Sequence, residues 1–126
     1  MNGAPMNRLM RALQFSFAGL RDAWQEPACR LEIVGIVLAV PVALLLPVTR
    51  VERVLLIVSV LMVLAIELLN TAVERTVDRI GVDRNELSRR AKDLGSAAVF
   101  VATIITAIVW IAIGVPAVIE MLGQPR

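Results

Sequence analysis

The chain has 126 residues, of which 58% are hydrophobic and 19% are charged. Soluble domains average about 45–50% apolar and about 25% charged residues, so this composition excludes an ordinary water-soluble domain and indicates a membrane protein. The net charge of +2 is too small to indicate a nucleic-acid-binding surface. One cysteine and no histidine exclude an internal disulfide framework and a zinc site, so any bound metal must be a hard cation held by carboxylates.

The first predicted element is an amphipathic helix over about residues 6–26. Its larger apolar residues recur at spacings of three or four, which places them on one helix face: Leu9, Leu13, Phe17, Leu20 and Trp24. Such a helix can lie along a membrane surface. Because the residue before a proline disfavours helical backbone, the Glu26-Pro27 step predicts a break before the next element.

Three runs that are poor in charge follow this helix. Residues 33–49 and 94–119 hold no charged residue, and residues 54–73 hold only Glu67. Each run is near or above the length of about 17–25 residues that a helix needs to cross a bilayer. We therefore predict transmembrane helices at about 31–49, 53–74 and 94–120.

The predicted fold class is an all-α membrane protein, with an amino-terminal interfacial helix and three transmembrane helices in a single domain spanning residues 1–126. Pro41 lies inside the first span and predicts a kink or a short helix there. Gly81 is the predicted turn after the second span. No residues remain for a separate soluble catalytic domain, so any site must be built from the spans and their flanks.

The distribution of basic residues predicts the orientation in the membrane. The segment up to Arg30 holds four arginines and the stretch 75–92 holds six basic residues, whereas the first connection holds only Arg50 and Arg53. By the positive-inside rule, the N-terminus and the second connection face the cytoplasm, and the C-terminal tail faces outward.

Glu67 is the most informative single residue, because a carboxyl group at hydrocarbon depth costs at least a few kcal/mol. Asn70, Glu74 and Asp78 follow it at intervals of three or four residues, so all four lie on one helix face. One interpretation is a hydrogen-bonded seam between helices. The alternative is a functional site, which two carboxylates on one stripe favour.

A second polar group consists of Lys92, Asp93 and Ser96 at the start of the third span. Its members also share a helix face, although a helix-start acid beside a lysine is an ordinary structural feature. Together with the carboxylates, this group could hold a magnesium–polyphosphate at the membrane face. Yet the sequence contains none of the nucleotide-binding motifs of soluble kinases or P-loop proteins.

The residues alone therefore leave three classes open. A lipid kinase would use a buried carboxylate to accept a hydroxyl proton. A small proton-coupled transporter would use the same intramembrane acid as a proton and substrate site, and a channel or accessory subunit would need no chemistry. The charged connection that continues the stripe favours phosphate chemistry.

Two segments of the sequence resemble the prokaryotic diacylglycerol kinase family. They are Glu67-Leu-Leu-Asn70 with Glu74 and Asp78-Arg79-Ile-Gly81, and Arg90-Ala-Lys92-Asp93-Leu-Gly95-Ser96. The resemblance extends from about Arg8 to Trp110. It implies a homotrimeric, three-span kinase of the inner (cytoplasmic) membrane that uses ATP and Mg²⁺ to phosphorylate diacylglycerol, or undecaprenol as the alternative lipid within the family.

The resemblance also implies residue roles. Glu67 resembles the catalytic base for the lipid hydroxyl, with Asn70 as its companion, and Glu26 and Glu74 resemble the metal carboxylates. The other positions implied at the nucleotide are Arg8, Phe15, Asp83, Arg84, Asn85, Lys92 and Asp93. Phe15 departs from the family pattern, which often has a tyrosine there. The positions implied at the lipid, besides Glu67, are Arg8, Ser16, Arg21, Trp24, Arg30, Glu32, Arg53, Ser96 and Trp110.

Overall fold

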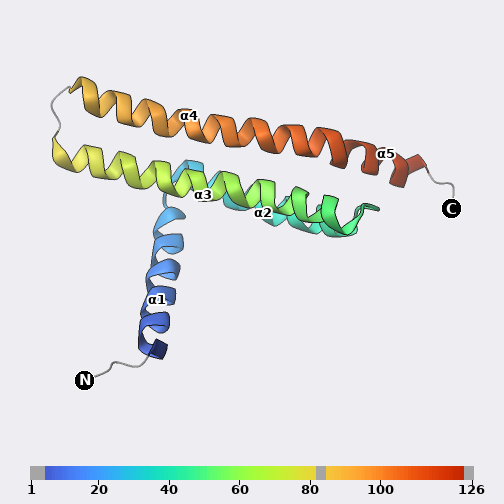
Figure 1. The fold of residues 1–126 in the computed structure, drawn as a ribbon, viewed down its shortest axis with the longest axis horizontal. Helices are drawn as coiled ribbons and strands as arrows, with labels where there is room; N and C mark the ends of the chain where they lie inside the picture. Colours follow the sequence, from blue (N-terminus) through green and yellow to red (C-terminus); the bar gives the residue numbers. More distant parts are fainter. Residues whose placement is uncertain (1–4, 82–84, 124–126) are drawn as a thin grey trace.

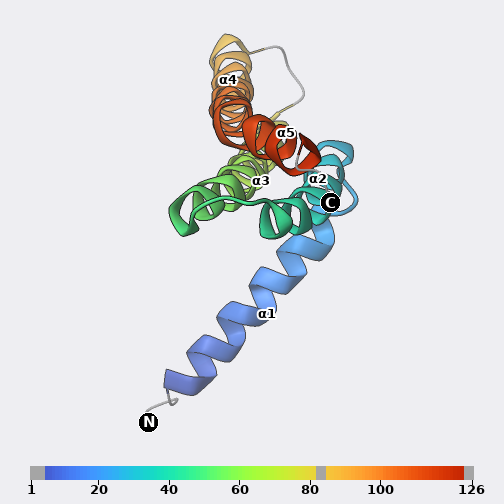
Figure 2. The ribbon, with the colours of Figure 1, turned by 90° about the vertical axis from the view of Figure 1, so that its right-hand side faces the viewer.

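The computed structural model describes residues 5–81 and 85–123, and every element in these ranges is helical. The elements are α1 (Pro5–Ala23), α2 (Pro27–Leu45), α3 (Arg50–Ile80), α4 (Glu86–Val109), a π-helical turn η1 (Trp110–Gly114) and α5 (Val115–Gly123). The long helices α3 and α4 run antiparallel, with α2 packed against α3 (Figure 1). Helix α1 projects sideways from this bundle, as the turned view in Figure 2 also shows.

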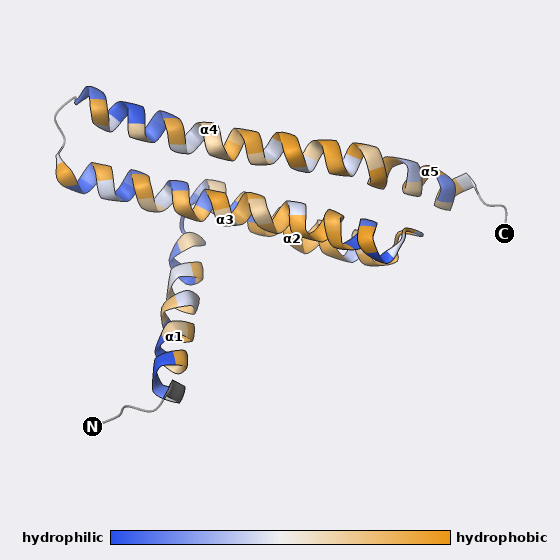
Figure 3. Ribbon diagram, in the orientation of Figure 1, coloured by the Kyte–Doolittle hydropathy of each residue, from blue (hydrophilic) through white to orange (hydrophobic). Residues whose placement is uncertain are grey.

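Three helical segments are long and apolar enough to cross a membrane: α2, α3, and the segment Glu86–Gly123 formed by α4, η1 and α5. Figure 3 shows the hydrophobic residues along these segments and the hydrophilic residues gathered where α3 ends and α4 begins. We call this region the polar end of the bundle. The predicted all-helical membrane fold with three spans is confirmed, and the protein is a multi-pass membrane protein.

Prolines and a glycine set several helix boundaries. Glu26 is the extended N-cap of α2 and Pro27 its first residue, where the missing proline N–H costs no helical hydrogen bond. The predicted break at this step is confirmed. Pro41 lies within α2, which continues to Leu45. Gly81 ends α3, as predicted.

A capping box starts α3 at the end opposite the polar end. The Glu52 backbone N–H donates to Thr49 Oγ1 over 3.3 Å, and the Thr49 backbone N–H donates to Glu52 Oε2 over 2.8 Å. These reciprocal bonds satisfy donors that have no partner inside the helix. They fix where the longest span begins.

Arg53 joins the end of α2 to the start of α3. Its Nε donates to the carbonyl oxygen of Ala43 over 3.2 Å, and its Nη2 donates to those of Leu46 over 3.1 Å and Val48 over 3.4 Å. The last carbonyl groups of a helix lack donors within the helix. The Arg53 side chain supplies donors to carbonyl groups at the end of α2 and in the turn after it. Arg53 therefore closes the α2–α3 turn.

The same end of the bundle holds the hydrophobic core. Leu56 is fully buried in a cluster with Ala43, Leu46 and Ala117. Trp110 Nε1 donates to the Leu56 carbonyl over 3.3 Å, which ties η1 to α3. This end is thus fixed both by apolar packing and by side chains that donate to backbone carbonyls.

Replacing Arg53 by alanine is expected to destabilise this turn. Hydrogen bonds from a charged donor contribute about 1.5–3 kcal/mol each, so we expect the free energy of unfolding to fall by about 2 kcal/mol or more. Denaturant unfolding in detergent micelles measures the change. Arg50→Ala, at the exposed first residue of the same helix, is the matched control, and equal stability of the two variants would contradict the role of Arg53.

Candidate active site

A stripe of four polar residues on α3 forms the centre of the candidate site. Glu67 is 6% exposed and Asn70 8% exposed, whereas Glu74 is half-buried and Asp78 is exposed. At about 1.5 Å per residue, Glu67 lies about 10 Å along the axis from Glu74 and about 16 Å from Asp78. The stripe therefore runs from the apolar part of the helix to the polar end, as its spacing predicted.

The contacts of the stripe show how its members are held. Asn70 Nδ2 donates to Glu74 Oε1 over 3.3 Å, within the same helix. Among the residues that the structure describes, Glu67 forms no hydrogen bond or ion pair. Within the described residues, the buried half of the stripe therefore makes its side-chain hydrogen bond inside α3 and not to another helix.

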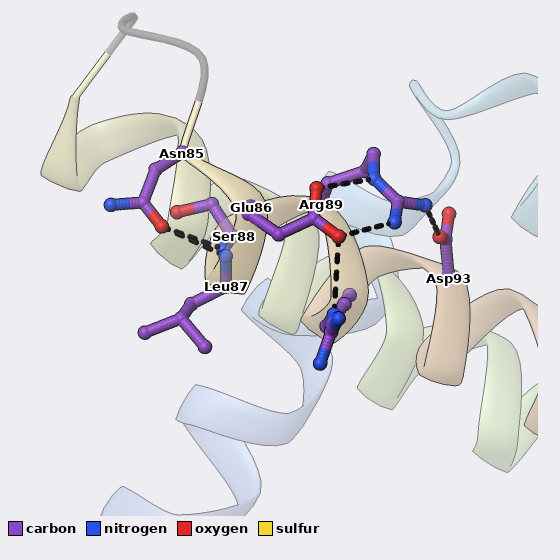
Figure 4. A network of polar contacts seen from close by, with 7 residues as sticks. Asn85, Glu86, Leu87, Ser88, Arg89 and Asp93 are labelled. Carbon is purple, nitrogen blue, oxygen red and sulfur yellow. Dashed lines mark hydrogen bonds and ion pairs between the residues drawn. The ribbon is translucent and has the colours of Figure 1, made fainter.

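The polar end is crossed by an ion pair between α3 and α4. Lys92 Nζ lies 3.0 Å from Asp78 Oδ1. Its sequence neighbour Asp93 pairs instead with Arg89 on the same helix (Figure 4). Ser96 is exposed one turn further along α4. Lys92 and Asp93 therefore lie at one end of the bundle but hold different partners.

Asn85 has a structural role at the start of α4. Its Oδ1 accepts from the backbone N–H of Leu87 over 2.8 Å and from that of Ser88 over 3.4 Å, as Figure 4 shows. This is an N-cap, which satisfies two donors at the helix start. Because Oδ1 is used in this cap, the nucleotide contact predicted for Asn85 would have to come from its Nδ2 amide group or its backbone. The other two predicted nucleotide residues of this segment, Asp83 and Arg84, lie outside the described residues.

Arg75 connects the surface helix to the stripe-bearing helix. Its guanidinium pairs with Asp22 on α1 and, over 2.7 Å, with Glu26 at the start of α2. Glu26, a predicted metal ligand, is therefore held near α3. Neither Asp22 nor Arg75 was predicted as a site residue, because no local sequence pattern signals a contact between residues 53 positions apart.

A cleft of about 550 Å³ opens between α1 and α3 beside this ion pair. It is lined by both polar and apolar residues: Ser16, Gly19, Leu20, Asp22, Ala23, Leu68, Thr71, Ala72 and Arg75. Such a cleft suits a molecule with a polar head and an apolar body. Of the predicted lipid-site residues, it contains Ser16.

The other predicted residues are dispersed over the chain. Of these, the exposed residues on α1, in the turn that follows it and at the start of α2 are Arg8, Phe15, Arg21, Trp24 and Arg30. Arg53 and Trp110 lie at the other end of the bundle, where both donate to backbone carbonyls. Fourteen residues of continuous helix place Arg53 about 21 Å along the axis from Glu67. The structure therefore does not bring Arg53 or Trp110 to the polar stripe.

Replacing Arg75 by glutamine is expected to loosen α1 without unfolding the bundle. Exposed ion pairs contribute only about 0–1 kcal/mol each, and both pairs of Arg75 are partly exposed. Hydrogen exchange of the last turns of α1 is expected to accelerate severalfold while α3 and α4 keep their protection. Arg79→Gln, four residues further along the same helix, is the control, and unchanged exchange in α1 would rule out this tether.

Comparison with known proteins identifies the family. The model described as prokaryotic diacylglycerol kinase matches residues 14–114. The "Diacylglycerol kinase" of Escherichia coli (strain K12) is 49% identical over 110 residues, covering 86% of this chain and 90% of the relative. That of Haemophilus influenzae is 47% identical over 106 residues (83% and 90%), and that of Pseudomonas aeruginosa 44% over 109 residues (86% and 89%). The matched residues include the stripe, its flanking ion pairs and the second half of α1, and the chain belongs to the prokaryotic diacylglycerol kinase family.

Proposed function

We propose that this protein transfers the γ-phosphoryl group of ATP to the hydroxyl group of diacylglycerol, giving phosphatidic acid. The observation that carries the proposal is Glu67, an almost fully buried carboxyl group in an apolar helix, continued by Asn70 and Glu74 to the polar end. Relatives named diacylglycerol kinase at 44–49% identity support the same reaction. Family membership favours the kinase over the transporter and the accessory subunit.

Glu67 is the base in this proposal. Its carboxylate accepts the proton of the lipid hydroxyl as the hydroxyl oxygen forms its bond to the γ-phosphorus, and the bond from that phosphorus to the bridging oxygen breaks to release ADP. The buried site excludes water, which would otherwise compete for the phosphoryl group. Asn70 stands between the base and Glu74, to which it is hydrogen-bonded.

The carboxylates of Glu26 and Glu74 are the proposed ligands of Mg²⁺. No cluster of three or more potential ligands occurs within residues 5–81 and 85–123, but Mg²⁺ is typically held by one or two carboxylates together with substrate phosphates. Glu26, paired with Arg75 next to Glu74 in the sequence of α3, and Glu74, hydrogen-bonded by Asn70, would supply two such carboxylates. When bound, Mg²⁺ neutralises charge on the phosphates.

Lys92 and Asp93 are the proposed contacts of the nucleotide, with Arg8, Phe15 and the segment 83–85. Lys92 is held by an exposed aspartate, and such a pair contributes little to stability. Its ammonium group can thus leave Asp78 for a phosphate oxygen at small cost. Phe15 stands where the family often has a tyrosine, and it is 73% exposed on α1. It can contact the nucleotide with its ring but has no hydroxyl group to donate.

The cleft between α1 and α3 is the proposed entry for the lipid head group. Ser16 lines it, and the remaining lipid contacts proposed near the polar end are Arg8, Arg21, Trp24, Arg30, Glu32 and Ser96. Arg53 and Trp110 are proposed for the far part of the lipid site only. The lipid's hydroxyl must come to Glu67, so the head-group contacts belong to α1, α2 and α4.

A homotrimer in the inner membrane, with the N-terminus and the second connection in the cytoplasm, is also part of the proposal. The apolar groove of about 460 Å³ between α3 and α4 is lined by several small residues: Ser59, Ala97, Ala98 and Ala102. Small residues allow helices of neighbouring protomers to approach closely. A second protomer in this groove would complete walls that one chain leaves open.

The central experiment is a phosphate-transfer assay with purified protein in mixed micelles containing MgATP. Separate reactions contain diacylglycerol, undecaprenol or no lipid acceptor. We expect labelled phosphatidic acid in the first reaction only. Transfer only to undecaprenol would assign the other lipid of the family, and no transfer to either lipid would contradict a kinase.

Replacing Glu67 by glutamine separates catalysis from packing in the same assay. Loss of the general base is expected to lower turnover by about 10²-fold or more, while nucleotide affinity changes little. Glutamine preserves size and hydrogen bonding, so a packing role predicts a fall of only a few-fold. Near-normal turnover with a weakened oligomer would contradict the catalytic role.

Replacing Glu74 by glutamine tests the metal assignment. The change removes one negative charge from the proposed donor set, so the Mg²⁺ concentration required for half-maximal activity is expected to rise about tenfold or more, with the affinity for diacylglycerol nearly unchanged. Glu120→Gln, in α5 at the other end of the bundle, is the control. A magnesium requirement equal to that of the control would show that Glu74 does not bind the metal.

A further inference from the structure

We infer that Gly95 on α4 is a positioning residue, which holds the side-chain amide of Asn70 in the orientation that serves Glu74. This inference rests on the proposed function and names a residue to which no role in it has been given. Asn70 lies between the proposed base and the proposed metal ligand, so the direction of its amide sets the hydrogen bonding of the whole stripe. Two independent observations point to Gly95.

The first observation is a close approach of the two helices at this glycine. A Cβ atom at position 95 would meet Asn70 Oδ1 well inside 3.0 Å and would lie 3.3 Å from Asn70 Cγ. No glycine in the described residues has a positive φ, so Gly95 is not needed for an unusual backbone conformation. A glycine inside a helix lowers helix stability relative to alanine. The absence of a side chain at this position is therefore explained by the space that Asn70 occupies.

The second observation is the state of the Asn70 amide. The residue is 8% exposed, and its Oδ1 is buried without a hydrogen-bond partner among the described residues. Its Nδ2 donates to Glu74 Oε1 over 3.3 Å. The amide is thus oriented with its oxygen against α4 and its donor toward Glu74. Buried polar atoms normally have hydrogen-bond partners. Because this oxygen has none among the described residues, the orientation of the amide is set by the packing of α4 at Gly95 and by the hydrogen bond to Glu74.

A methyl group at position 95 would act through Asn70 and not through the backbone. The atom it meets is the end of a side chain that can rotate, so the amide can turn away while the helices stay packed. The hydrogen bond to Glu74 would then be lost. A misplacement of about 1 Å in a supporting group can lower turnover by about 10²-fold, so the effect falls on catalysis more than on stability.

The test compares Gly95→Ala in the wild-type and in the Asn70→Ala background. We expect Gly95→Ala alone to lower kcat by about 10²-fold with little change in the KM for diacylglycerol. In the Asn70→Ala background, where no amide remains to be displaced, the same substitution is expected to change kcat by less than about twofold, as for sites that act as one unit. An equal loss in both backgrounds would overturn the inference.

A second readout does not depend on activity. The chain contains only four asparagines, so protein labelled with ¹⁵N at asparagine gives few side-chain amide resonances, and the one missing in Asn70→Ala is that of Asn70. We expect Gly95→Ala to shift this resonance and leave those of the other asparagines in place. Gly35→Ala, at a helical glycine with no atom within 4 Å of an added Cβ, is the matched control. An unmoved Asn70 resonance in Gly95→Ala overturns the inference whatever the activity.

The remaining outcomes are also decisive. A shifted resonance with normal kcat overturns the positioning role. If Gly95→Ala fails to fold, the double variant with Asn70→Ala is expected to restore the folded protein, and its failure to do so overturns the inference. A wild-type chain that phosphorylates no lipid contradicts the proposed function instead, and the resonance of Asn70 then decides the steric contact by itself.

Discussion

The rest of the structure depends on keeping one carboxyl group, that of Glu67, inside a helix built for hydrocarbon. Placing such a group at this depth costs at least a few kcal/mol of free energy. The surrounding protein must therefore stabilise the group, or the group must serve a function. The unbroken length of α3 carries the polar stripe from Glu67 to the exposed Asp78 on one face. Helix α4 packs closely over the middle of that stripe, where Gly95 leaves room for Asn70. The carboxyl group is thus buried yet connected to the polar end.

The two ends of the bundle are held by different kinds of interaction. Opposite the polar end, Arg53 and Trp110 donate to backbone carbonyls beside the fully buried Leu56. At the polar end, the helices are joined by partly exposed ion pairs, including those of Arg75 and Lys92. Exposed ion pairs contribute little to stability, so their members can exchange a protein partner for a phosphate or a metal. One end is therefore held by buried packing, and the proposed function would use the weaker ion pairs of the other end for charged substrates.

Periodicity and charge predicted the features that arise within one segment. The three spans and the shared face of Glu67 and Asn70 follow from helical geometry, and the break at Pro27 follows from the effect of proline on the residue before it. Contacts between segments were not predictable in this way. Asp22 and Arg75 are 53 residues apart, and nothing local marks them as partners. The resemblance assigned Arg53 to the lipid site, and its structural role could not be predicted because the carbonyls it satisfies become its neighbours only when α2 ends at Leu45.

Helix length also divides the lipid site that the resemblance implied. Arg53 lies about 21 Å along the axis from Glu67, which exceeds half of the roughly 30 Å hydrocarbon core. In the proposed function, a lipid of one leaflet whose hydroxyl reaches Glu67 would therefore meet Arg53 and Trp110 only with the ends of its acyl chains. Recognition of the head group would then fall to groups nearer the stripe, such as Ser16 in the cleft beside α3. The far end then affects chain accommodation and stability, which is the behaviour expected of residues that donate to backbone carbonyls rather than to a substrate.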